Sequence, residues 1–233
     1  MLKVSNLVKT YRRAKEPALK GISFEVEKGE VFGLIGKNGA GKSTTIKCLM
    51  GIHPYDDGTI TIKGYDLKKN ENEAKSLIGY VPDNHTVYEN LSGREYLNFM
   101  ADVYKVDKDV RDKNIEKYAK MFNLSHALDM QISSYSHGMH QKICIMGALV
   151  HEPEMWVLDE PFLGLDHASI KNVKQCVLDY AKSKGNIVVF SSHNMDTVTD
   201  VCDRVCVIEK GRVKEILNMK NSTDVLKLRS YMK

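Results

Sequence analysis

The hydrophobic positions of the chain follow two spacings, and the first is the alternation of a strand. Ile22, Phe24 and Val26 alternate with polar residues, which predicts a half-exposed strand, and residues 1–30 as a whole predict short antiparallel strands. Short apolar runs predict further strands at 31–35, 60–62, 78–81, 155–158, 187–190 and 205–208. Strands that alternate with helices predict an α/β core with a parallel sheet, whose carboxyl edge binds ligands.

The second spacing is helical and dominates from about residue 85 to residue 152. Ser92 and Glu95 form a capping-box sequence, and apolar positions at helical spacing follow it. A later helix near 139–150 is almost continuously apolar, which predicts that it is buried. We therefore expect four segments along the chain. They are two pieces of an α/β core at 1–84 and 154–217, a helical insertion at 85–153, and a tail at 218–233 to which the pattern assigns no role.

Composition narrows the class of protein. The 233 residues are 42% hydrophobic and 27% charged, as in a globular protein, and we expect no signal peptide and no run of about eighteen apolar residues that could span a bilayer. The net charge of +4 is small and its basic residues are spread along the chain, so we expect no nucleic-acid partner. Five cysteines without paired spacing indicate a reducing compartment and buried thiols rather than a metal site.

The stretch Val31–Thr45 joins a buried strand to a glycine-rich turn and the start of a helix. Gly36, Gly41, Lys42 and Ser43 fit the phosphate-loop pattern GxxxxGKS/T. The glycines let backbone N–H groups approach phosphate oxygens, and the helix adds the positive end of its dipole. Lys42 is placed to reach the β- and γ-phosphates, and the Ser43 hydroxyl to bind Mg²⁺. The alternative is a chance glycine turn, but the apolar strand before it favours nucleotide binding.

A phosphate loop requires a metal-binding carboxylate at the end of another buried strand. Asp159 follows the apolar run 155–158 and meets this requirement, so we expect it to hold Mg²⁺ directly or through water. Glu160 either points away from the strand or leads into the next loop, where a carboxylate could orient and deprotonate an attacking water. The alternative is a pair of solvated acids after a strand.

Three further residues have both a functional and a structural interpretation. His193 follows the strand 187–190 at the predicted ligand edge and could position a water, although a single histidine is often structural. Asp83 follows the strand 78–81 at the same edge, or it faces solvent in an open loop. Tyr11 lies in a polar loop and is either a shelf for a purine base or an ordinary surface tyrosine.

These motifs, in this order, resemble those of the ATP-binding-cassette (ABC) ATPases, and the resemblance extends from about Leu2 to Val213. The matching segments are GKNGAGKST at 36–44, the signature sequence YSHGM at 135–139, VLDE at 157–160, GLD at 164–166 and His193. The resemblance implies an α/β fold of the P-loop, RecA-like type. It implies a mixed sheet core, an N-terminal antiparallel β subdomain and an inserted α-helical subdomain that carries the signature.

The resemblance also implies an ATPase that uses ATP and Mg²⁺, with its site residues in three groups. Those implied to contact the nucleotide are Tyr11, Gly36, Asn38, Gly39, Ala40, Gly41, Lys42, Ser43, Thr44, Ser136, Gly138 and Asp166. Those implied to hold the metal are Ser43, Asp83 and Asp159, and those implied to be catalytic are Glu160, His193 and Lys42. Asp83 replaces the usual glutamine of the family, and His137 replaces a glycine of the signature, which puts a bulky side chain near the partner's phosphate.

The family likeness further implies partners. Two such domains pair head to tail, so that ATP lies between the phosphate loop of one and Ser136 and Gly138 of the other. A separate membrane-spanning subunit binds the helical insertion, which implies a cytoplasmic protein on the inner face of the membrane, here most similar to exporter subunits. Two alternatives remain, namely a soluble cassette that acts on ribosomes or DNA and a cassette that binds ATP only to regulate a partner.

Overall fold

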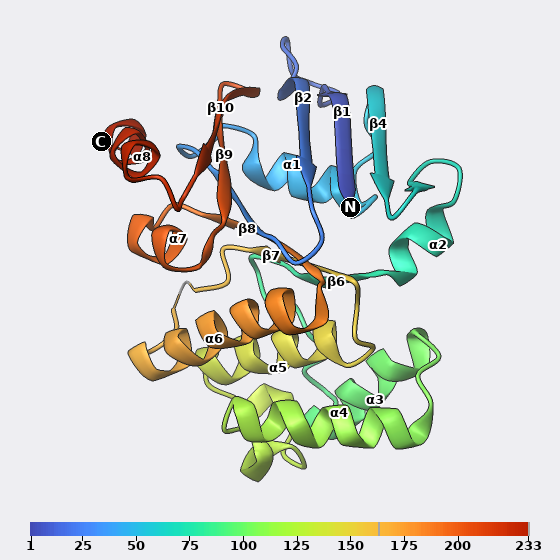
Figure 1. Cartoon of the computed structure of the whole chain (residues 1–233). Helices are drawn as coiled ribbons and strands as arrows, with labels where there is room; N and C mark the ends of the chain where they lie inside the picture. The colour runs from blue at the N-terminus through green and yellow to red at the C-terminus, as the bar shows by residue number, and fades with distance from the viewer. Residues whose placement is uncertain (163, 233) are drawn as a thin grey trace.

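The computed structural model describes residues 1–162 and 164–232 and is shown in Figure 1. The strands are β1 (Leu2–Lys9), β2 (Leu19–Val26), β3 (Val31–Ile35), β4 (Asp57–Ile62), β5 (Tyr65–Asp66), β6 (Ile78–Val81), β7 (Met155–Asp159), β8 (Ile187–Ser192), β9 (Arg204–Glu209) and β10 (Arg212–Asn218). The α-helices are α1 (Lys42–Leu49), α2 (Glu71–Ser76), α3 (Gly93–Val103), α4 (Lys108–Met121), α5 (His137–Leu149), α6 (His167–Lys184), α7 (Met195–Val201) and α8 (Ser222–Met232). Two short 3₁₀ helices are η1 (Ser125–Ala127) and η2 (Ile132–Ser134).

The strands form two sheets. A six-stranded sheet has the order β10-β9-β3-β8-β7-β6, in which all neighbours are parallel except the hairpin of β9 and β10. A four-stranded antiparallel sheet has the order β2-β1-β4-β5. The expected mixed sheet core and N-terminal antiparallel sheet are both confirmed.

The central strand β3 is buried on both faces, and its alternate side chains enter two different cores. Phe32 and Leu34 pack with the four-stranded sheet and with Ile46 of α1. Val31 and Ile35 pack on the opposite face, in the core that α5 and α6 share. Because successive side chains of a strand point to opposite faces, one apolar run of five residues anchors both layers. Figure 1 shows α1 between the two sheets, with α5 and α6 beyond the other face.

Helices α3 and α4 lie beyond α5, away from the four-stranded sheet (Figure 1). The capping box at the start of α3 is confirmed, because the Ser92 hydroxyl accepts from the Glu95 N–H at 3.2 Å and the Glu95 carboxylate from the Ser92 N–H at 2.8 Å. Helix α5 is buried over most of its length, as its apolar sequence predicts. The five cysteines are buried as well. None of the helices in the described ranges is long and apolar enough to cross a bilayer.

The tail differs from its featureless sequence pattern. Residues 222–232 form α8, which packs on β10 and buries Leu228 completely. Lys227 Nζ pairs with a Glu215 carboxylate oxygen of β10 at 2.8 Å. The helix is stabilised by tertiary contacts rather than by strong periodicity, so the pattern alone missed it. Residue 233 lies outside the described residues.

Candidate functional site

The carboxyl ends of four neighbouring strands place the candidate site on one edge of the six-stranded sheet. Strand β3 leads into the glycine-rich loop, β8 into His193, β7 into Asp159 and Glu160, and β6 into the turn that holds Asp83. These strands are adjacent in the order β3-β8-β7-β6 and parallel to one another, so their carboxyl ends meet. Segments that are far apart in the chain therefore lie along a single edge of the sheet.

The glycine-rich loop has a backbone that larger residues would disrupt. A Cβ on Gly36 would lie 2.2 Å from the Ile208 carbonyl oxygen of β9, so the loop depends on the missing side chain there. Gly41, before α1, has a φ of 117°, in the region that side chains disfavour. The buried Lys42 ammonium turns back along the loop and donates to the Gly36 carbonyl oxygen at 2.7 Å. Lys42 thus lies within the cradle of backbone N–H groups, where an anionic ligand would replace the carbonyl partner.

Asp159 is fully buried at the end of β7, and one of its two oxygens lacks a partner in the described chain. Its Oδ1 accepts from the Ser43 hydroxyl at 3.3 Å and from the Ser191 hydroxyl. Burial raises the pKa of Asp159, the two hydroxyl groups oppose the rise, and the charges of Asp83 and Glu160 add to it. An unpartnered carboxylate oxygen beside a serine hydroxyl is a donor set that suits Mg²⁺, which would favour the ionised form. The predicted metal residues Asp159 and Ser43 are therefore adjacent.

Glu160 leaves the strand through a left-handed backbone turn. Its φ is 51°, which is uncommon for a residue with a side chain, and its N–H donates to the Ser191 hydroxyl at 3.0 Å. This turn directs the carboxylate toward His193, whose Nδ1 lies 3.0 Å from Glu160 Oε1. Glu160 is mostly covered while His193 remains 57% exposed. Of the two orientations that the sequence allowed, Glu160 has the one that enters the loop and faces His193.

A cavity of about 390 Å³ follows the glycine-rich loop. Its walls are Ala18, Asn38, Gly39, Gly41, Lys42, Ser43, Thr44, Asp83 and Glu160. Asp83 thus lies beside the other carboxylates, with its side chain exposed. Tyr11 stands next to the loop, because its hydroxyl is 3.1 Å from Thr44 Oγ1 and its ring is 38% exposed. An exposed aromatic ring beside a phosphate loop could stack on a base, and the contact of Tyr11 with a nucleotide stays a prediction.

The signature residues do not line this cavity. Ser136 is the N-cap of α5 and accepts from the Met139 N–H at 3.3 Å, with Gly138 in the first turn. Asp166 is the N-cap of α6 and accepts from the Ser169 N–H at 2.9 Å, which lowers the pKa of Asp166. Neither cap is on the wall of the cavity at its own phosphate loop. Their predicted contacts with a nucleotide therefore need a second copy and stay predictions.

Two residues that sequence reasoning missed support the site. Ser191 joins Asp159 to the backbone of Glu160, and the polar pair Ser191–Ser192 at the end of an apolar strand was the available signal. Gln141 is fully buried in α5, and its Nε2 donates to the Pro161 carbonyl oxygen. In the sequence Gln141 stands between His140 and Lys142, so nothing in the pattern separated it from its polar neighbours.

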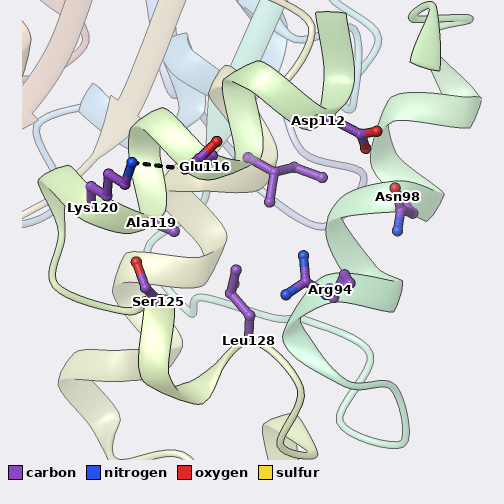
Figure 2. Close-up of a pocket in the computed structure, with 9 residues that line it drawn as sticks. Arg94, Asn98, Asp112, Glu116, Ala119, Lys120, Ser125 and Leu128 are labelled. Carbon is purple, nitrogen blue, oxygen red and sulfur yellow. Dashed lines mark hydrogen bonds and ion pairs between the residues drawn. The ribbon is translucent and has the colours of Figure 1, made fainter. Parts of the chain in front are cut away.

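A second cavity, of about 500 Å³, lies between α3 and α4 (Figure 2). Two cations on its wall, Arg94 and Lys120, already pair with Asp129 and Glu116, at 2.6 and 2.7 Å respectively. The cavity also carries Asp112 and has no glycine-rich turn on its wall. A triphosphate would find better partners at the sheet edge.

Comparisons with known proteins identify the family to which the chain is similar. The sequence profile of the ABC transporter family matches residues 19–163. The linearmycin resistance ATP-binding protein LnrL of Bacillus subtilis is 36% identical over 97% of this chain and 70% of its own length. A solved ATP-binding subunit of an ABC transporter is 31% identical with a TM-score of 0.90, covering 100% of this chain and 94% of that one. The cbiO1 protein of Clostridium perfringens, described as part of the ABC transporter complex cbiONQ, is 30% identical with a TM-score of 0.81 over 97% and 93%.

The fold, the phosphate loop beside paired carboxylates and the similarity over nearly the whole chain agree with one another. The chain belongs to the ABC transporter family and is an ATP-binding, ATP-hydrolysing subunit of an ABC transporter.

Proposed function

We propose that this ATPase subunit forms a head-to-tail dimer around two ATP molecules and drives a separate membrane-spanning subunit that exports its substrate. It acts on the cytoplasmic face of the membrane, as a peripheral protein held by that subunit. The observation that carries the proposal is the single sheet edge at which Lys42, Asp159 and the Glu160–His193 pair meet beside the glycine-rich loop.

Each residue at this edge has a distinct task in hydrolysis. Lys42 neutralises the β- and γ-phosphates within the cradle of backbone N–H groups. Glu160 accepts the proton of a water aligned with the γ-phosphate, and His193, 3.0 Å away, fixes the carboxylate and contacts the same phosphate. Asp159 and Ser43 would hold Mg²⁺, which when bound would supply positive charge beside the phosphate oxygens. Tyr11 stacks on the adenine.

The positions of the two N-caps support the proposed dimer. Ser136 and Asp166 start helices that lie outside the cavity of their own phosphate loop. The N-terminus of α5 carries a partial positive charge and free backbone N–H groups, which suit a phosphate. In a head-to-tail pair, Ser136 and Gly138 meet the γ-phosphate on the second copy. ATP then joins the two copies, and its hydrolysis releases them.

The replacement of Asp83 by glutamine is expected to change the Mg²⁺ requirement. Asp83 adds a third carboxylate to a cavity that already holds Glu160 and lies near the buried Asp159, whose pKa its charge raises. The three carboxylates repel the γ-phosphate, and a bound cation screens this repulsion. Hydrolysis should therefore depend more strongly on the cation with Asp83 than with a neutral side chain at that position. We expect Asp83→Gln to shift the Mg²⁺ concentration for half-maximal turnover at fixed ATP, with a smaller change in nucleotide affinity without metal. Asp57→Asn, on β4, is the control, and superimposable Asp83→Gln and wild-type curves would show that Asp83 only faces solvent.

The surface that receives the membrane subunit lies at the start of the helical insertion. Tyr88 is 59% exposed and Phe99 of α3 is 42% exposed, with their rings edge to face at 5.2 Å. They border a hollow of about 610 Å³ whose other lining residues are the apolar Val87 and Leu91 and the polar Glu89 and Asn90. Exposed aromatic side chains around a hollow are typical of protein contacts. We assign this hollow to a cytoplasmic segment of the membrane subunit.

The word "resistance" in the name of the relative LnrL supports export.

Co-purification from membranes tests this assignment. The chain is expected to recover one integral membrane protein in stoichiometric amount from a mild-detergent extract. Phe99→Asp should lose that protein while keeping ATP turnover, because a charge in the hollow cannot be desolvated. Val110→Asp, an equally exposed position on α4, is the control that should retain it. Equal recovery with Phe99→Asp, or membrane association without an integral membrane protein, would overturn the assignment.

A further inference from the structure

His137, the first residue of α5, lies against the loop that follows β7. A Cβ built on Gly164 would be 2.6 Å from His137 Nε2 and 2.7 Å from its Cδ2. The imidazole therefore occupies the place of a side chain at position 164. Gly164 also has a φ of 81°, so its backbone conformation itself favours glycine. The imidazole of His137 thus fills the space that is open because Gly164 has no side chain.

The same imidazole lies close to the loop that follows β6. Its ring and that of His85 are nearly perpendicular, with centroids 5.9 Å apart. His85 is only 5% exposed and adopts a positive φ of 45°, two residues after Asp83. One side chain at the start of α5 thus lies beside both loops that carry carboxylates to the site, the loop of Asp83 and the loop that follows Glu160.

Two other residues of α5 also reach the second loop. Gln141 is one turn beyond His137 and donates to the carbonyl oxygen of Pro161, the residue after Glu160. A Cβ on Gly138 would be 4.0 Å from Leu165 Cδ2. Because residues four apart share a helix face, His137 and Gln141 hold the loop at two points along its length.

We propose that His137 is a positioning residue for ATP hydrolysis, because its ring fixes the loops after Asp83 and Glu160 against the start of α5. The proposal rests on the role of Glu160 as the base, given under the proposed function. His137 is not on the wall of the cavity at the phosphate loop, so it acts on the geometry of the reacting groups and not on nucleotide affinity in one copy. A small displacement of a catalytic group lowers the rate far more than it lowers binding.

A double-mutant cycle between His137 and Gly164 tests the contact. We expect His137→Gly and His137→Ala to lower kcat about tenfold while the dissociation constant of a fluorescent ATP analogue stays within about twofold, because only the geometry of Glu160 changes. Gly164→Ala should lower kcat about tenfold as well, since its methyl group displaces the ring. The double variant His137→Gly/Gly164→Ala should be no slower than Gly164→Ala alone, because the methyl then has room.

Matched variants separate positioning from general disturbance. His137→Phe keeps a flat ring of similar size and should retain turnover within about threefold of the wild type. His126→Gly makes the same change at an exposed histidine of η1 and should have no effect. Thermal unfolding of the single variants at His137 and His126 should stay close to that of the wild type, whereas Gly164→Ala should unfold earlier because of its positive φ of 81°.

Three results would overturn the proposal. The first is that both His137→Gly and His137→Ala keep the wild-type kcat. The second is that the losses of the single variants multiply to about a hundredfold in the double variant, as they do for independent sites. The third is that His137→Phe is as slow as His137→Gly. Glu160→Gln reports separately on the proposed function. If that variant hydrolyses ATP normally, the base assignment fails, while the cycle still shows whether His137 and Gly164 are coupled.

Discussion

The substitution Glu160→Gln is expected to leave ATP binding intact and to lower hydrolysis by roughly a hundredfold to ten-thousandfold, the usual contribution of a general base. The amide has nearly the same shape as the carboxylate, so the left-handed turn at residue 160 and the contact with His193 can persist. It cannot accept a proton from water. ATP that binds is then not consumed, and the ATP-bound dimer should accumulate.

Size-exclusion chromatography with Mg-ATP, beside a phosphate-release assay, measures both effects. Glu160→Gln should elute as a dimer with ATP and as a monomer without it, whereas the wild type returns to monomer as it turns over. Glu73→Gln, the same change on the exposed helix α2, should behave as the wild type. Wild-type phosphate release by Glu160→Gln would remove Glu160 from the mechanism.

The substitution Lys42→Ala is expected to have the second large effect, a loss of about thirtyfold to a few thousandfold in affinity for ATP. Removing one partner of a buried charge pair costs roughly 2–5 kcal/mol, and each 1.4 kcal/mol is tenfold in the dissociation constant. Lys42 is only 7% exposed, so water cannot take over the role of its ammonium group. In the free protein its partner is the Gly36 carbonyl oxygen, which is neutral, so stability should change little.

Titration with a fluorescent ATP analogue, followed by a turnover assay, checks this result. Lys47→Ala removes a lysine from the same helix outside the cavity and should bind normally. Thermal unfolding without nucleotide should be similar for Lys42→Ala and the wild type. If affinity and turnover were both unchanged in Lys42→Ala, the loop at 36–44 would not be the phosphate site.

Local chemistry explains why much of the fold was predictable. The strand Val31–Ile35, its glycine-rich loop and the start of α1 are contiguous in sequence, so their spacing alone specifies a phosphate cradle. The capping box of α3 is equally local and was confirmed. Helix α8 was missed because its stabilisation comes from burial of Leu228 and a pair with Glu215, which no local pattern contains. Parallel strands placed Asp159 and Asp83 on the same edge as the loop.

The sequence by itself determined the residues of this protein that can bind phosphate, metal and water, and the strand end at which each one lies. Only the tertiary structure decided how they face one another. The left-handed turn of Glu160 directs it to His193, 33 residues away, and the missing side chain of Gly164 leaves room for His137. These contacts join segments that are distant in the chain. Their geometry depends on how the strands and helices pack, which no pattern within a single segment specifies.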